Sequence, residues 1–212
     1  DGRVVGYPTQ ASTPAGDWLR KNPRIHPLGQ ISLDYRNADG SALAPDDVRK
    51  PEQTLDLWRG VITSQFELDG QAVKVTTVCH PTKDLVAVRI ESNLIASGRL
   101  GATIALPRGY DLAVKHTPPL DWSQPASHQT RVASQTPNWA RLERSVGDTH
   151  YETDVAWAGK AHFTNPSPHH FHLAAAEPAK VLEFTVGFYP GPAPSSAAPS
   201  VEATVSTSAA HW

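Results

Sequence analysis

Three histidines in the last third of the chain could together bind a metal ion. His170 and His172 lie two residues apart, so on a β-strand both side chains would point to the same face. His162, on the preceding predicted strand, could add a third imidazole, and imidazole is a common zinc ligand. No carboxylate lies at a defined spacing from them. We therefore favour the alternative, a polar strand face that carries imidazoles, and predict neither a metal nor another cofactor.

Acidic residues are the second source of possible chemistry. A glycosidase needs two carboxyl groups that flank the bond to be cleaved. Asp46 and Asp47 follow Pro45 in a predicted turn, where aspartate commonly accepts hydrogen bonds from its own backbone. No spacing selects a pair from the other aspartates considered, which are Asp56, Asp111, Asp121 and Asp154. We therefore predict no catalytic residue in this chain.

The single cysteine, Cys79, lies next to His80, which could suggest a thiol–imidazole pair. Adjacent residues of a strand point to opposite faces, however, so the two side chains should diverge. We predict that Cys79 is a buried packing residue. The chain also contains no Gly-x-Ser-x-Gly, His-Glu-x-x-His or phosphate-binding glycine motif.

Tryptophan is the third candidate for function. The six tryptophans are Trp18, Trp58, Trp122, Trp139, Trp157 and Trp212. Exposed indole rings stack on sugar rings, so a group of them would indicate carbohydrate binding. Packing roles are the alternative, and we favour them. Trp139 and Trp157 could fill the core, while the tryptophans in or beside loops could pack against a partner domain.

These side chains need a scaffold, and residues 55–106 carry the clearest structural signal. Apolar residues alternate with polar ones over residues 62–68, which is typical of a half-buried strand. Asp69-Gly70 favours a two-residue type I′ turn, which would place Leu68 opposite Gln71 and Phe66 opposite Val73. The alternating residues 86–90 and 100–106 predict a second pair of strands in the same sheet, joined by a loop at residues 93–99.

Further alternating stretches predict ten to twelve strands and almost no helix. We therefore predict an all-β fold, a large antiparallel β-sandwich, for residues 1–189. Residues 190–200 are rich in proline, alanine and serine and are interpreted as a linker, followed by a weak strand at 201–206. The chain has 212 residues, a net charge of −2, and no methionine. From its ends we expect a piece of a longer polypeptide, truncated at the N-terminal side of the sandwich.

The composition argues against several partners. A net charge of −2 provides no basic field for nucleic acid, and no apolar run approaches the roughly 18 residues of a membrane span. One cysteine permits neither an internal disulfide nor a cysteine metal cluster. We expect no nucleic acid and no membrane among the partners.

Four stretches resemble the N-terminal β-sandwich of bacterial six-hairpin glycosidase-like proteins. They read HPLGQISL (26–33), TLDLWRGVITSQF (54–66), TVCHPTKDLVAVRIES (77–92) and NLIASGRLGATIALPRG (93–109). The likeness is to glycoside hydrolase family 95, the α-L-fucosidases, and more distantly to family 65. It implies a supersandwich of the galactose-mutarotase-like type, with residues 190–212 leading to an (α/α)6 catalytic barrel that this chain does not contain. The catalytic carboxylates of such families lie on the barrel, so none is carried over, and the enzyme class suggests a place outside the cytoplasm.

The resemblance implies that the chain is a non-catalytic domain that supports the barrel and partly walls its cleft. We expect residues 18–26 and 107–124 to face the barrel. The residues predicted to contact the barrel or an oligosaccharide are Trp18, Arg20, His26, Trp58, Asp121 and Trp122. Two alternatives stay open: a carbohydrate-binding module acting on its own, and a metal-dependent hydrolase using the three histidines.

Overall fold

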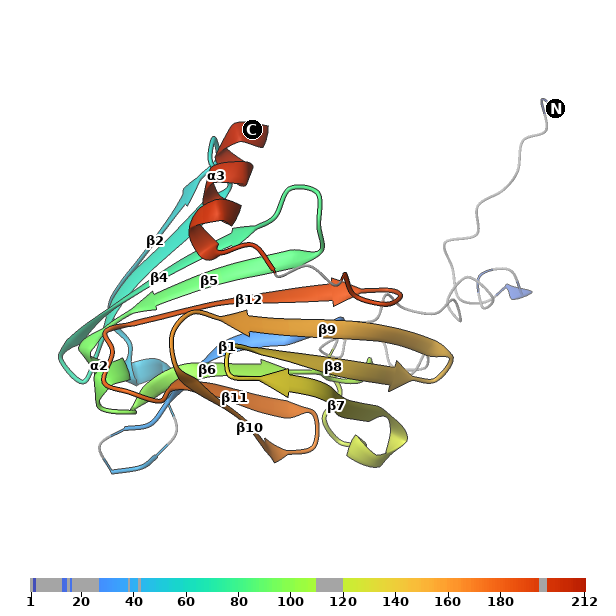
Figure 1. Ribbon diagram of the computed structural model, residues 1–212, viewed down its shortest axis with the longest axis horizontal. Coiled ribbons are helices and arrows are strands. Elements are labelled where there is room, and N and C mark those ends of the chain that lie inside the picture. Colours follow the sequence, from blue (N-terminus) through green and yellow to red (C-terminus); the bar gives the residue numbers. More distant parts are fainter. Residues whose placement is uncertain are drawn as a thin grey trace.

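The computed structural model describes residues 27–37, 39–41, 43–109, 120–194 and 198–212, and the single positions 2, 13, 14 and 16. Within these residues the fold is an antiparallel β-sandwich of twelve strands (Figure 1), which confirms the predicted fold class. The strands are β1 (Gln30–Tyr35), β2 (Arg49–Asp56), β3 (Val61–Leu68), β4 (Gln71–Cys79), β5 (Leu85–Glu91), β6 (Leu100–Ala105), β7 (Gln129–Thr136), β8 (Trp139–Val146), β9 (Thr149–Trp157), β10 (Ala161–Ser167), β11 (His170–Ala175) and β12 (Val181–Tyr189). The helices are η1 (Pro45–Asp47), α2 (Asn93–Ala96), η2 (Pro125–Ser127) and α3 (Val201–His211).

The strands form one large and one small sheet. The large sheet has eight strands in the order β2-β3-β4-β5-β12-β9-β8-β7, and the small sheet has four in the order β1-β6-β11-β10. The main core lies between the two sheets, where apolar faces of both are packed together. No helix in the described part of the chain has the length and hydropathy needed to cross a membrane.

The predicted hairpin at residues 62–77 is present with the expected register. Leu68 pairs with Gln71 and Phe66 pairs with Val73 across β3 and β4. Asp69 and Gly70 both have positive φ, 50° and 69°, as a type I′ turn requires. The register follows from the sequence because the turn dipeptide and the alternation agree with each other.

The second predicted strand pair is wrong. β5 and β6 do not pair with each other: β5 lies in the large sheet and β6 in the small one. Between them, α2 begins after Ser92, whose hydroxyl accepts a hydrogen bond from the Leu94 amide at 3.2 Å. Leu94 and Ile95 are buried, so this connection crosses the sandwich as part of the core. Alternation alone could not show whether β5 and β6 lie in one sheet or in two, since both sheets turn their apolar faces to the same core.

Aromatic rings fill the middle of the core. Phe163 stacks between Trp157 and Phe171, with centroid distances of 5.4 Å to each. Trp157 is buried, which confirms that part of the prediction. Trp139 is only half-buried. It pairs with Ala156 on β9 and lies on the outer face of the large sheet, so its assignment to the core was wrong.

The inner face of the large sheet is left uncovered at the free ends of β3 and β4. Ile62 remains 36% exposed, although its alternation matches that of the buried Leu68. Cys79, the last residue of β4, is exposed, so the prediction that it is buried is wrong. Figure 1 shows β2 and β4 rising away from the small sheet, which explains why residues at this end have no opposing layer.

The prediction of a strand at residues 201–206 is also wrong, since these residues belong to α3. The Ser200 hydroxyl caps the helix by accepting a hydrogen bond from the Ala203 amide at 3.1 Å. The buried residues Val201, Thr204 and Ser208 recur at intervals of three and four, which is the spacing of one helical face. Val201 packs in a second apolar cluster on the outer face of the large sheet, together with Val61, Val78, Leu85 and Ala87.

Strand β2 forms one edge of the large sheet and is almost entirely exposed. Its register with β3 shifts between Arg49 and Glu52, where the strand contains a bulge or irregularity. Lys50 within this stretch has a φ of 49°, and Pro51 follows it. The first half of this edge strand is therefore irregular.

Candidate functional site

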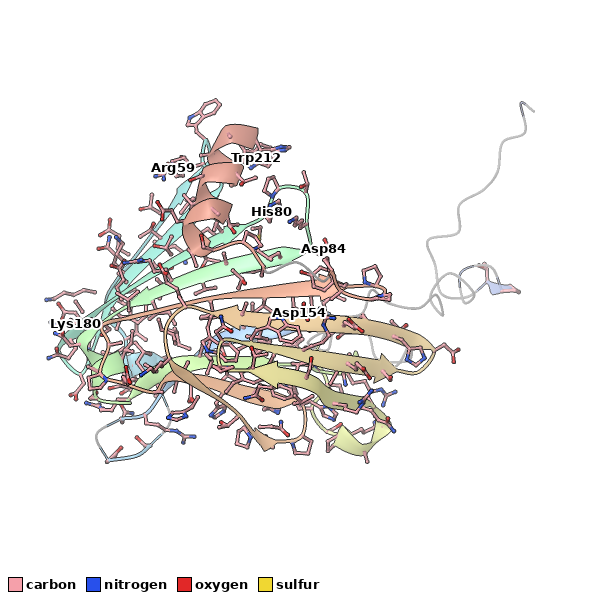
Figure 2. The ribbon with its side chains drawn as sticks, in the orientation of Figure 1. Arg59, His80, Asp84, Asp154, Lys180 and Trp212 are labelled. Atoms are coloured by element: carbon pink, nitrogen blue, oxygen red, sulfur yellow. The ribbon has the colours of Figure 1, made fainter. Side chains whose placement is uncertain are left out.

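The turn between β2 and β3 carries the most prominent exposed aromatic residue of the described chain. Trp58 is 80% exposed, and Leu57 beside it is also exposed. Trp212, at the end of α3, is 68% exposed and lies next to this turn, because a Cβ atom on Gly60 would lie 3.1 Å from its Nε1. Figure 2 shows Arg59, from the turn, and Trp212 at the same end of the molecule.

Two further exposed apolar residues lie beside the turn, on the inner face of the large sheet and thus on the opposite face from α3. They are Leu55 and Ile62, which face each other across β2 and β3. We call the whole area the edge surface, and it consists of Leu55, Leu57, Trp58, Ile62 and Trp212. Exposed apolar residues that gather in one place commonly mark a site of protein interaction.

The turn that carries Trp58 is held by hydrogen bonds from its backbone amides to the Asp56 side chain. The Asp56 carboxylate accepts hydrogen bonds from the amides of Trp58 and Arg59 at 3.1 and 3.2 Å. Gly60 closes the turn with a φ of 62°, a conformation that favours glycine. Trp58 is thus presented on a defined turn, which reduces the entropy lost when a partner binds.

Asp121 and Trp122 lie in another part of the fold. Asp121 is buried, and its Oδ1 accepts hydrogen bonds from the Ser123 amide at 2.9 Å and the Ser123 hydroxyl at 2.6 Å. These bonds lower the pKa of the Asp121 carboxyl, so it is ionised at neutral pH. Trp122 is 37% exposed and lies against His170, with 4.7 Å between ring centroids.

A buried polar cluster forms around Arg144 on β8 and includes His169, the residue before His170. Arg144 is 1% exposed, and its Nη2 donates to the Pro107 carbonyl at 2.7 Å. Its Nη1 donates to His128 Nδ1 and to the Gln129 carbonyl, the latter at 3.1 Å. The imidazoles of His128 and His169 are stacked with centroids 3.7 Å apart. We call Arg144, His128 and His169 the arginine cluster.

The histidines of the arginine cluster are neutral at pH 7. Burial lowers the pKa of His128 to about 4, and the Arg144 guanidinium contributes to this lowering. Burial also lowers the pKa of His169. His169 Nε2 donates to the Pro125 carbonyl at 2.9 Å, so its Nδ1 is the acceptor for the Thr130 hydroxyl at 2.7 Å.

The guanidinium of this cluster is costly to bury. Burial lowers the pKa of Arg144, and its Nε has no hydrogen-bond partner among the described residues. Arg144 nevertheless joins the segment after β6 to the start of β7, because it donates hydrogen bonds to the Pro107 and Gln129 carbonyls. Without Arg144 these carbonyls would lose that hydrogen-bond donor. The arrangement suits a structural link between loops and strands, since its imidazoles are neutral and largely enclosed.

The three histidines proposed as metal ligands are not brought together. His172 Nδ1 lies 3.0 Å from Asp34 Oδ2, whereas His170 Nδ1 donates to the Pro168 carbonyl at 2.8 Å. His162 pairs with Ala174 in the register of β10 and β11. Within the described ranges, no three histidine, cysteine, aspartate or glutamate side chains are grouped as a metal site would require.

The other candidates are separated by the fold. Trp58 lies at the edge of the large sheet, while Asp121 and Trp122 lie beside the start of β11 in the small sheet. Trp58 and Trp122 therefore belong to different surfaces. Trp18, Arg20 and His26, and residues 110–119 of the predicted barrel-facing loop, lie outside the described residues. Their roles remain predictions.

Sequence reasoning missed the arginine cluster, although β8 carries a signal for it. Ala140, Leu142 and Val146 alternate as buried residues, and Arg144 occupies the one remaining position of that series. A charged residue at an inward position of an alternating strand indicates a buried charge that needs partners. Its partners, however, come from segments that the strand pattern cannot locate.

Comparisons with known proteins give little further identification. No family model matches the chain, and no curated protein matches it. One solved structure that this chain partly matches is provisionally assigned as a kojibiose phosphorylase from the human microbiome. It is 12% identical to this chain, with a TM-score of 0.43 over 75% of the chain. The chain spans 21% of the length of that protein. The fold assignment therefore rests on the strand order described above, and the comparisons do not identify family 95.

Proposed function

We propose that this chain is the non-catalytic β-sandwich domain of a carbohydrate-active enzyme, related to glycoside hydrolase families 95 and 65. In this proposal it supports an (α/α)6 barrel in the same polypeptide and walls part of its cleft. The sequence resemblance and the all-β sandwich support the proposal. The observation that carries it is the edge surface, which is apolar and exposed and whose most exposed residue, Trp58, lies on a fixed turn beside α3.

The composition of the edge surface suits a protein partner better than a small polar ligand. Its five side chains are all leucine, isoleucine or tryptophan. Aromatic and aliphatic residues form the centre of stable protein interfaces, and an exposed charge such as Arg59 on the same turn suits the polar rim around that centre. Two tryptophans at this position could insert between helices of a neighbouring domain. We propose that the barrel packs here, and that Trp58 supplies most of the contact energy.

Activity measurements on two forms of the protein test this proposal. The polypeptide encoded by the complete gene and the 212-residue chain would be assayed for hydrolysis and phosphorolysis of fucosyl and glucosyl disaccharides. We expect turnover by the complete polypeptide and none by the chain alone. Turnover by the chain, or a complete polypeptide without a helical catalytic domain, would contradict the proposal.

A double variant of the complete polypeptide tests the edge surface. Leu57→Ser with Trp58→Ala should lower activity at least about tenfold, because loss of the interface mispositions the cleft wall. Val132→Ser is the matched control, since Val132 is an exposed apolar residue on β7 at the opposite edge of the large sheet. Equal activity in the double variant and the control would rule out docking at this surface.

A further inference from the structure

A groove lies on the outer face of the large sheet, away from both the edge surface and the arginine cluster. It has a volume of about 500 Å³ and runs between β8 and the start of α3. Strands β8, β9 and β12 form its floor, and residues 198–201 form the opposite wall. The volume falls within the range of small-molecule sites, which is roughly 300–1,000 Å³.

The shape of the groove follows from the size of the side chains on neighbouring strands. Trp139 on β8 pairs with Ala156 on β9, which in turn pairs with Thr185 on β12. A large ring beside two small side chains leaves a step in the surface, with the indole as its wall. Trp139 is half-buried, so part of its ring remains accessible. The Arg141 guanidinium carbon lies over this ring, 5.0 Å from its centroid, so a flat ligand can pack only against the part of the indole that Arg141 leaves uncovered.

Polar groups are fixed at the same place. The guanidinium of Arg141 donates to both Asp154 carboxylate oxygens at 2.8 Å, through Nε and Nη2 (Asp154 is labelled in Figure 2). Its Nη1 makes no hydrogen bond to a described residue. The Asn138 carbonyl oxygen accepts a hydrogen bond from the Thr136 hydroxyl at 3.2 Å, which leaves the Asn138 amide donors free of described partners. Both residues line the groove.

The charges around the groove are already compensated. Arg141 contacts the carboxylates of Asp154 and Glu152, and Glu183, which also lines the groove, is paired with Arg89. No excess of positive charge is available for a phosphate or a carboxylate ligand. The groove therefore suits a neutral molecule that has an apolar face and several hydroxyl groups.

We propose that this groove binds a neutral saccharide of one or two sugar units. One sugar ring packs against the part of the Trp139 indole that Arg141 leaves uncovered, and its hydroxyls accept hydrogen bonds from Arg141 Nη1 and the Asn138 amide. Glu183 supplies an acceptor for a sugar hydroxyl at the floor. This binding site does not depend on the proposed barrel, so it can be tested on the chain alone.

Titration of the ¹⁵N-labelled 212-residue chain with maltose, cellobiose and lactose tests the site. We expect at least one disaccharide to bind with a Kd of about 0.1–10 mM, the weak range typical of small polar ligands. The amide shifts should centre on residues 138–141 and 156–158 and on the Trp139 indole N–H. Sodium glucuronate should bind at least about tenfold more weakly than the best neutral sugar, because the groove offers no net positive charge.

Two variants make the test specific. Trp139→Ala removes the stacking wall, and Ala156→Leu fills the floor of the groove without removing a polar group. Each should weaken binding at least about tenfold, whereas Trp58→Ala should bind within about twofold of the parent. Circular dichroism checks that each variant is folded, and Ala156→Leu decides the outcome if Trp139→Ala does not fold. No binding up to about 20 mM, shifts centred on Trp58 or Trp122, or unchanged binding in a folded Ala156→Leu variant would overturn the proposal.

Discussion

Strand β8 carries two arginines that serve different regions of the molecule. Arg144 points inward and is buried against neutral partners, namely two imidazoles, backbone carbonyls and the Thr130 hydroxyl. Arg141 points outward, is partly exposed and is paired with Asp154. The pKa of Arg144 is lowered by burial, whereas hydrogen bonds to Asp154 raise the pKa of Arg141. The comparison shows how one strand can use the same side chain for internal linkage and for a surface site.

The same substitution at the two positions should separate these roles. Arg144→Lys should lower the free energy of unfolding by about 4 kcal/mol, because one ammonium cannot serve the Pro107 carbonyl and His128 together. Urea denaturation measures the loss. A change below about 1 kcal/mol would show that the buried guanidinium contributes little to stability.

Acid should weaken the region around Arg144 in particular. The pKa of His128 falls from its ordinary value of 6.5 to about 4 in the folded chain, so folding favours the neutral ring. Its contribution is therefore complete above pH 6.5 and is lost as the pH falls from 6.5 towards 4, amounting to about 3 kcal/mol.

A variant isolates this contribution from that of the titrating carboxylates. His128→Asn keeps an acceptor for Arg144 but does not titrate. The unfolding free energy of the parent should therefore fall more steeply than that of the variant between about pH 7 and pH 4. Parallel curves would show that His128 does not control this acid sensitivity.

The outer region can be perturbed through the contact between α3 and the β2–β3 turn. Gly60→Ala should lower the free energy of unfolding by about 2 kcal/mol, because φ at this position is positive and the new Cβ would lie 2.7 Å from Ser208 Oγ. Gly147→Ala is the control: its φ is also positive, 55°, but a Cβ there meets nothing within 4 Å. Thermal unfolding of both variants separates the backbone cost from the contact cost, and equal losses would mean that α3 does not press on the turn.

The smallest effect is expected at the second arginine. Arg141→Lys should lower the free energy of unfolding by about 1 kcal/mol, since Asp154 keeps a charged partner and only the bidentate hydrogen bond is lost. Its effect should appear instead in the groove, as weaker saccharide binding in the NMR titration. A stability loss as large as that of Arg144→Lys would remove the distinction between the two residues.

The sequence predicts much of the fold because local signals agree within each strand. The β3–β4 hairpin was predicted to the residue, since Asp69-Gly70 and the alternation fix the same register. The assignment of β5 and β6 to one sheet failed because alternation shows that a strand is half-buried but not which sheet it joins. The prediction of a strand at residues 201–206 failed because valine and threonine favour strands. The packing of this segment on the large sheet as a helix cannot be read from so short a stretch.

Less of the site could be predicted. Trp58 was identified from residue type and loop position, and its exposure agrees with a contact role that is still to be tested. The arginine cluster and the groove depend on residues that meet only after folding, such as Arg144 with His169 and Trp139 with Ala156. Residue types and local spacing mark Arg144 as an inward charge, but they do not say which distant residues it will meet.

The irregular first half of β2 limits how this molecule can associate. A regular edge strand can template a strand from another chain, which leads to swapped dimers or fibres. Pro51 lacks an amide hydrogen, Lys50 adopts a positive φ and the register shifts around them, so a continuous hydrogen-bond ladder cannot extend outward from this stretch. A partner at the neighbouring edge surface must therefore bind through side chains. The exposed tryptophan and leucines can be recognised there without the sheet growing into an aggregate.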